Sequence, residues 1–222
     1  MQATTTADLR GASQQLGVPL DEEMANKLLR LLEELEQWNR AYNLTGIENR
    51  EAMVATHLLD SLAVSGDLAG PRIADLGTGA GFPGLPLAIV HPERHFTLID
   101  ATAKKIRFVT HAARALGLAN VEAVQARAES MRPRELFDTV IARAVAPLPK
   151  LAGLARPLSR PGTRLLALKG KRPVAELAAI PSDWELLGVR EFHVPGLEAE
   201  RCLVTLIARI GVPRAASFPV SA

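Results

Sequence analysis

The chain has 222 residues, of which 48% are hydrophobic and 23% charged, an ordinary globular composition that can form one substantial core and a smaller appendage. Its formal net charge of +2 is too small to indicate a nucleic-acid partner by itself, and its single cysteine, Cys202, excludes an intrachain disulfide. The first residues lack the basic start and apolar stretch of a signal peptide, and no apolar run approaches the ~20 residues of a membrane span, so we expect a cytoplasmic protein with no membrane partner.

The first part of the chain has a helical pattern. A helix start follows Pro19, because the acids at 21–23 stabilise a first turn. Apolar side chains then recur at helical spacing: Met24, Leu28, Leu31, Leu32, Leu35 and Trp38. Residues 49–64 form a second candidate helix, and residues 66–71 a boundary. We therefore expect a helical segment over 1–66 packed on a domain over 67–210, with a disordered tail over 211–222.

Strands and helices alternate after this boundary. We expect strands near residues 72–76, 95–100, 121–126, 137–143 and 163–168, and helices near 83–91, 104–117, 147–158 and 174–179. This alternation predicts an α/β fold with a Rossmann-like, doubly wound and mostly parallel sheet. Residues 184–194 and 201–210 predict a terminal hairpin that adds one antiparallel strand.

The turn after the first expected strand contains three alternating glycines, Gly77, Gly79 and Gly81. Glycine in a strand-to-helix turn lets the backbone approach a ligand closely, because no Cβ intervenes. The next strand ends on Asp100, where an acid can accept both hydroxyls of a ribose. The pattern therefore predicts a site for a nucleoside cofactor.

Two interpretations of these glycines compete. Residues 79–84 match the GxGxxG pattern of dinucleotide sites, but the strand already ends at Gly77, and Pro83 and Pro86 remove N–H donors that a pyrophosphate would use. Read from Asp75, the pattern acid-x-Gly-x-Gly-x-Gly resembles the first motif of class I S-adenosylmethionine (SAM) methyltransferases, whose ligand has no phosphate. We therefore expect SAM as the cofactor, with S-adenosylhomocysteine as its product.

Basic residues follow the carboxyl ends of successive expected strands, where ligands bind in a doubly wound sheet. They are Lys104, Lys105, Arg127, Arg143, Lys169, Lys171 and Arg172. One cation could pair with the carboxylate of SAM, but several would repel its sulfonium and amino group. A cationic rim therefore indicates a polyanionic second substrate, such as an RNA backbone.

The segment after the fourth strand bears on which atom is methylated. Exocyclic amines of bases are commonly methylated with an Asp/Asn-Pro-Pro-aromatic turn, whereas residues 142–147 read Ala-Arg-Ala-Val-Ala-Pro. Methylation at carbon 5 of a pyrimidine needs a cysteine nucleophile, but Cys202 falls in a late strand, away from the expected site, as a buried small hydrophobe. Guanine N7 attacks with its own lone pair and needs only in-line alignment at ~3–3.5 Å. Guanine N7 therefore needs neither device and no general acid or base, and an N7 substrate would have to be an unpaired guanine, because A-form RNA hides the major-groove edge.

Motifs along most of the chain resemble the bacterial 16S rRNA guanine-N7 methyltransferase family RsmG, formerly called glucose-inhibited division protein B. The resemblance runs from about residue 33 to residue 208, through WNRAYNLT from Trp38, HLLDSL from His57, DLGTGAGFPGLPLAI from Asp75, TLID from Thr97, RAE from Arg127, RAVA from Arg143, KG from Lys169 and RCLV from Arg201. It implies methyl transfer to a guanine near the decoding site, with 16S rRNA or the small ribosomal subunit as the partner. We expect the enzyme to be a monomer.

The resemblance also implies roles for particular residues. Gly77 and Phe82 would line the SAM pocket, Ala128 and Glu129 would lie beside the adenosine, and Arg143 would contact the cofactor region. The positions implied to face the substrate are Asn43, His57, Lys104, Arg127, Lys169 and Arg201.

His57 and Asp60 share a helix face because they are three residues apart. Two ligands without a third make a poor metal site, so we expect no metal. Taken alone, the two residues indicate a surface pair, whereas the resemblance favours a place lining the active site. Trp38 and the leucines indicate a core, and Tyr42 is the better candidate for stacking on RNA.

Other functions remain open on the residues alone. The rim cations could pair with the acidic groups of a metabolite in a small-molecule SAM methyltransferase. The chain could also be an RNA-binding ribosome-maturation factor with a degenerate cofactor fold, although its glycines and Asp100 are intact. A dehydrogenase with a nicotinamide cofactor is disfavoured by the position of the glycines relative to the end of the strand.

Overall fold

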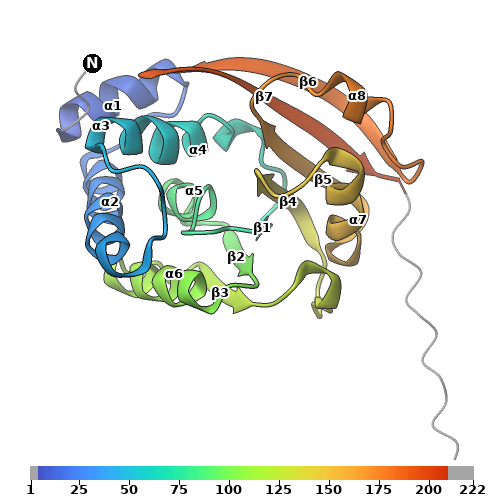
Figure 1. Cartoon of the computed structure of the whole chain (residues 1–222), viewed down its shortest axis with the longest axis horizontal. Helices are drawn as coiled ribbons and strands as arrows, with labels where there is room; N and C mark the ends of the chain where they lie inside the picture. The colour runs from blue at the N-terminus through green and yellow to red at the C-terminus, as the bar shows by residue number, and fades with distance from the viewer. Residues whose placement is uncertain (1–4, 210–222) are drawn as a thin grey trace, which may run out of the picture.

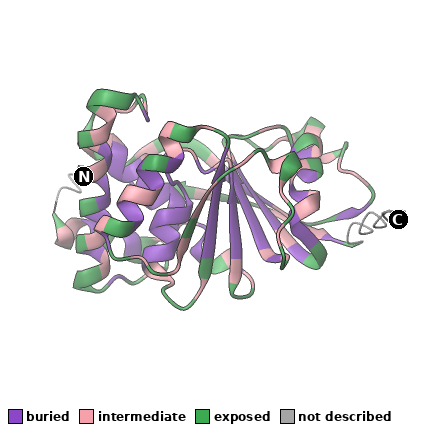
Figure 2. Cartoon of the chain, turned by 90° about the horizontal axis from the view of Figure 1, so that it is seen from below, coloured by how far each residue is buried: buried purple, intermediate pink, exposed green. Residues whose placement is uncertain are grey.

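A computed structural model describes residues 5–209 and contains a central sheet with helices on both faces (Figure 1, Figure 2). The strands are β1 Arg72–Leu76, β2 His95–Asp100, β3 Val121–Gln125, β4 Phe137–Arg143, β5 Ser159–Lys169, β6 Trp184–Val194 and β7 Leu197–Ala208. Their order is β3-β2-β1-β4-β5-β7-β6. Neighbouring strands from β3 to β5 pair in parallel, and β7 is antiparallel to both of its neighbours. The predicted mostly parallel sheet with one antiparallel terminal strand is confirmed.

The helices form two groups (Figure 1). The group on one face comprises α1 Thr6–Gln15, α2 Glu22–Tyr42, α3 Arg50–Met53, the π-helix η1 Val54–Leu59, α4 Asp60–Leu62, the short 3₁₀ helix η2 Ser65–Asp67, α5 Gly84–Val90 and α6 Ala103–Ala115. The group on the other face comprises η3 Ala128–Ser130, α7 Leu148–Ala155, η4 Arg156–Leu158 and α8 Val174–Leu177. None of the helices within residues 5–209 is long and apolar enough to cross a membrane.

Strand periodicity divides the core between the two faces. Ile73 of β1 packs with the group that contains α2, α5 and α6, whereas Ala74 and Leu76 pack with the group that contains α7. Successive strand residues point to opposite faces, so both faces of β1 are covered by apolar side chains.

The long helix α2 forms where the acidic start and the apolar stripe predicted it. The Asp21 side chain accepts the Met24 N–H at 2.7 Å and caps the helix. The predicted leucines are buried, and Trp38 lies against the core with its ring 5.7 Å from that of Phe108 on α6. The helix ends at Asn43, which has a left-handed backbone conformation.

The second expected helix, over 49–64, is helical but not uniform. It begins as α3, continues as the π-helix η1 and ends as α4. A π turn inserts one extra residue and changes the direction of the side chains that follow it, and such turns occur frequently at functional sites.

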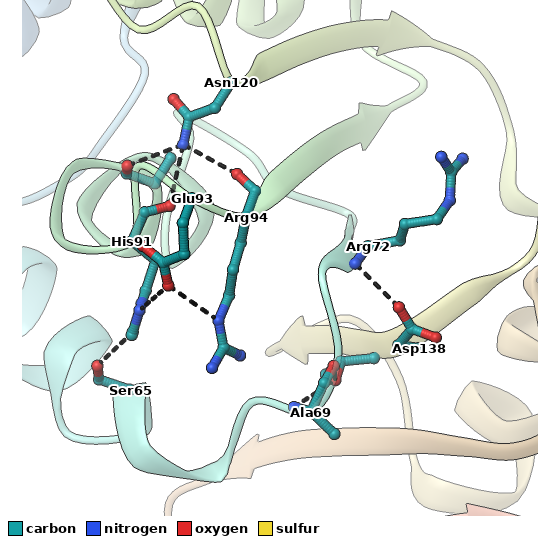
Figure 3. Close-up of polar contacts among 10 residues, drawn as sticks. Ser65, Ala69, Arg72, His91, Glu93, Arg94, Asn120 and Asp138 are labelled. Atoms are coloured by element: carbon teal, nitrogen blue, oxygen red, sulfur yellow. Dashed lines mark hydrogen bonds and ion pairs between the residues drawn. The ribbon is translucent and has the colours of Figure 1, made fainter.

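The amino ends of the strands are joined by side-chain contacts (Figure 3). The Asn120 amide nitrogen lies within 3.2 Å of three carbonyl oxygens, those of Ala88, His91 and Arg94. The Asp138 carboxylate accepts the Arg72 N–H at 3.0 Å. At the end of the sheet where the parallel strands begin, these polar groups are therefore hydrogen-bonded within the protein.

The topological switch point lies at the opposite end of the sheet, where the parallel strands end. β1 lies between β2 and β4, so the strand order reverses at the carboxyl ends of β1 and β4. Ligands of doubly wound sheets bind in the crevice at this point. The expected tail over 211–222 lies outside the described residues.

Candidate functional site

The glycine loop after β1 lies at the switch point and is held by the neighbouring strand. The Gly77 and Thr78 N–H groups donate to the Ile99 carbonyl at 2.8 and 3.0 Å. Gly77 has φ 69°, and a Cβ added to it would lie 2.6 Å from the Val145 side chain. Gly79 has φ 60°, but a Cβ there would meet no atom within 4 Å. Gly77 is therefore required for close packing, whereas Gly79 exposes backbone to open space that a ligand can enter.

Asp75 organises this loop from the inside. Its Oδ2 accepts the Thr78 hydroxyl at 2.5 Å and the Gly84 N–H at 2.8 Å. Burial raises the pKa of Asp75 to about 6, against the opposing effect of these hydrogen bonds. Its Oδ1 is buried and has no hydrogen-bond partner among the described residues, which fits a ligand that brings an N–H donor. Asp75 opens the glycine motif, yet the predicted site residues did not include it.

Asp100 reaches the same loop from the end of β2. Its Oδ2 accepts the Gly79 N–H at 3.1 Å, and its Oδ1 accepts the Thr102 N–H at 2.8 Å. The Lys105 ammonium lies 3.7 Å from Oδ2. Each carboxylate oxygen has two lone pairs, so Asp100 retains acceptors for ribose hydroxyls. The structure therefore brings the predicted ribose acceptor against the open glycine backbone, and these residues fit SAM.

Phe82 and His57 form a stacked pair beside the loop. Their ring centroids are 4.7 Å apart with an interplanar angle of 23°, and the Arg143 guanidinium carbon lies 5.9 Å from the Phe82 centroid. His57 Nε2 lies 3.0 Å from the Thr45 hydroxyl. Burial, and secondarily the charge of Arg143, lowers the pKa of His57 to about 4. The imidazole is therefore neutral at neutral pH and contributes hydrogen bonds rather than charge.

This neutral imidazole makes stability depend on pH. In the unfolded chain His57 takes up a proton near pH 6.5, whereas in the folded protein it does so near pH 4, so the stability of the fold falls as pH decreases between these values. We expect the difference in unfolding free energy between the wild type and His57→Asn to shrink by ~3 kcal/mol from pH 7 to pH 4. Denaturant unfolding across this range measures it. The titration of Asp75 cancels in the difference, because both proteins contain Asp75. A constant difference for His57→Asn would contradict a neutral buried imidazole.

Asp60 was expected, on its spacing alone, to form a surface pair with His57, and this prediction is wrong. His57 is 7% exposed and Asp60 is 1% exposed. Asp60 Oδ2 lies 3.2 Å from Nη1 of Arg143, and its Oδ1 accepts the Nε–H of Arg201 at 2.9 Å. Helical spacing showed that the two residues share a face, but only packing places that face against the sheet.

Two further predicted substrate residues lie together at the end of α2. The Lys104 ammonium donates to the Tyr42 carbonyl at 2.8 Å, and exposed Asn43 follows directly. Tyr42, the candidate for stacking, has 41% of its surface exposed. The Asn39 side chain shapes the turn, because it accepts the N–H groups of Leu44 and Thr45.

Lys169 at the end of β5 is held by its own chain. Its ammonium donates to the Ala146 carbonyl at 3.0 Å and to Glu176 Oε2 at 2.8 Å. Lys105, Lys171 and Arg172 also each lie 3.7 Å from a carboxylate oxygen, so the rim carries less free charge than the sequence suggested. Cys202 is buried as predicted, but it pairs in register with Lys169 and so lies at this rim rather than away from it.

The remaining predicted residues follow β3. Arg127 and Glu129 are exposed, and Ala128 is half-buried against the core cluster that contains α7. These residues lie at the carboxyl end of β3, which pairs with β2 as far as Asp100. They therefore lie at the same end of the sheet as Asp100.

A doubly wound sheet of this order, with a glycine loop after β1 and an acid at the end of β2, defines a class I SAM-dependent methyltransferase. A SAM-dependent methyltransferase from Aquifex aeolicus, at 19% identity, superposes with a TM-score of 0.54 over 75% of this chain and 97% of that chain, which supports the fold.

The sequence model of the family described as rRNA small subunit methyltransferase G matches residues 24–204. Curated relatives from several bacteria bear the name ribosomal RNA small subunit methyltransferase G, and two of them illustrate the similarity. The protein from Methylococcus capsulatus is 52% identical, with 89% of this chain and 95% of the relative covered, and the protein from Nitrosococcus oceani is 46% identical, with 87% and 91% covered. The chain belongs to the rRNA small subunit methyltransferase G family.

Proposed function

We propose that this protein transfers a methyl group from SAM to N7 of a guanine in 16S rRNA, near the decoding site of the small ribosomal subunit. Membership of a family named for methylation of small-subunit rRNA is the observation that carries the proposal. SAM supplies an already activated, electrophilic methyl group. The protein therefore has to bind both partners and align them, without removing a proton first.

The contacts around the glycine loop support the cofactor side of this proposal. Gly77, Gly79 and Gly81 would cradle the cofactor, with Asp100 holding the ribose and Ala128 and Glu129 beside the adenosine. Phe82 and Arg143 would close the pocket on the side of His57.

The surroundings of the pocket support a nucleophile that needs no activation. The turn after β4 contains no Asp/Asn-Pro-Pro-aromatic sequence. Burial raises the pKa of the Cys202 thiol, which disfavours a thiolate nucleophile. Asn43, His57, Lys104, Arg127, Lys169 and Arg201 would position the RNA. The proposal includes an enzyme that acts as a monomer in the cytoplasm.

Methyl transfer from labelled SAM to small ribosomal subunits and to naked 16S rRNA tests this function. Both substrates should come from cells that lack this modification, with fully modified subunits as the matched control. We expect one methyl group per RNA, found by chain scission that is selective for 7-methylguanosine. Transfer to neither substrate, with SAM binding intact, would instead indicate a methyltransferase for an anionic small molecule.

A further inference from the structure

One buried carboxylate joins the N-terminal helices to two strands of the sheet. Asp60 begins α4, directly after the π-helix η1, and its side chain is only 2% exposed. Each oxygen contacts a different guanidinium, that of Arg143 at the end of β4 and that of Arg201 on β7. Arg143 Nη1 also donates to the Thr56 carbonyl at 2.7 Å, so two neighbouring residues of the helical segment hold it.

Two guanidinium groups share the Asp60 carboxylate. Their side chains are only 19% and 18% exposed. Two cations this close and this buried would separate without an anion between them, because their repulsion is poorly screened. Asp60 therefore determines where both guanidinium groups lie, while the buried Asp75 carboxylate is a second anion close enough to interact with Arg143.

The geometry leaves part of each guanidinium for a ligand. The internal contacts use Nη1 of Arg143, and Nε and Nη1 of Arg201. A guanidinium has five N–H donors, so further donors remain on both residues. Arg143 also lies beside Phe82, which places this cluster next to the glycine loop.

We propose that Asp60 is a positioning residue for methyl transfer, which aligns Arg143 and Arg201 toward the nucleotide that enters beside Phe82. This inference rests on the proposed function. Asp60 acts through the two arginines and touches neither reactant. Asp60 directly follows the π-helix η1, and such turns occur frequently at functional sites. Alignment of existing charges should affect the rate at saturation more than the binding of RNA.

The test compares Asp60→Asn with Asp67→Asn. Asp67, on η2, is a matched control because its carboxylate also joins the N-terminal segment to a strand arginine, Arg190, at 2.6 Å. Unlike Asp60, it does not lie beside the glycine loop. For Asp60→Asn we expect kcat for methyl transfer to fall ~10–100-fold, while KM for RNA and the Kd for SAM change less than about threefold. Asp67→Asn should leave kcat within about twofold of the wild type, even if its Tm falls as much as that of Asp60→Asn.

Two outcomes would overturn the proposal. The first is an unchanged kcat for Asp60→Asn. The second is an equal decrease in kcat for Asp60→Asn and Asp67→Asn when their Tm values fall by the same amount. If Asp60→Asn does not fold, Asp60→Glu keeps the charge, moves it by one methylene, and should show the same split. Transfer by the wild type is measured in the same assay, so its absence would count against the proposed function and not against the role of Asp60.

Discussion

Replacement of Asp100 by alanine is expected to weaken SAM binding at least ~100-fold. The variant would lose the hydrogen bonds between the carboxylate and the ribose, and charge-assisted bonds of this kind contribute ~1.5–3 kcal/mol each. The loss would also release the Gly79 N–H, which Asp100 Oδ2 accepts at 3.1 Å, and so loosen the loop. Titration calorimetry with SAM measures the effect directly.

Two companion variants separate this effect from a general loss of stability. Asp100→Asn keeps one acceptor oxygen and should bind SAM ~10-fold more weakly than the wild type. Asp138→Ala removes a carboxylate near the opposite end of the sheet, where it accepts the Arg72 N–H, and should leave SAM affinity unchanged (Figure 3). An Asp100→Ala protein whose Kd for SAM stays within threefold of wild type would place the cofactor elsewhere.

Replacement of Lys169 by alanine is expected to lower kcat/KM for RNA ~10–100-fold while SAM affinity stays within twofold. A lysine that contacts a phosphate contributes a charge-assisted interaction of ~1.5–3 kcal/mol, and its loss should reduce the slope of log K against log salt by about 1. The ammonium must exchange its contact with Glu176, at 2.8 Å, for the RNA. Filter binding at several salt concentrations and single-turnover transfer measure both quantities.

The control for this variant is Lys27→Ala. Lys27 pairs with Glu23 near the start of α2, whereas the end of α2 contacts Lys104. Lys27 and Tyr42 are separated by ~22 Å of helix at 1.5 Å per residue, so Lys27 should lie outside the contacts that position the guanine. An equal loss in both variants would reduce the role of Lys169 to general attraction of RNA, and no loss in either would remove Lys169 from the substrate site.

The fold and the cofactor loop were predictable because their signals are local. Gly77 and Asp100 end consecutive strands of one β-α-β unit, and parallel strands bring such ends to the same edge of a sheet. The apolar stripe of α2 likewise determines which face of that helix is buried. These arguments need only the periodicity of each element and the order in which the elements follow one another.

The cation cluster was less predictable, because its contacts join distant parts of the chain. Arg201 reaches Asp60 across 141 residues, and this contact depends on the insertion of β7 between β5 and β6. The rim cations were recognised as basic residues, but not their carboxylate partners, such as Glu176 for Lys169. The sequence shows that a residue is charged, but it does not show whether that charge is already paired with another residue of the same protein.

The sequence by itself therefore determined the alternating fold, the glycine turn with Asp100, and the resemblance to a methyltransferase family, because each follows from local periodicity or a contiguous motif. Only the tertiary structure decided that His57 is a buried neutral imidazole and that Asp60 is its buried neighbour between two arginines. Burial and pairing depend on what packs against a face. In this protein the packing partners come from the carboxyl end of β4 and from the first half of β7, which lie far from α4 in the sequence.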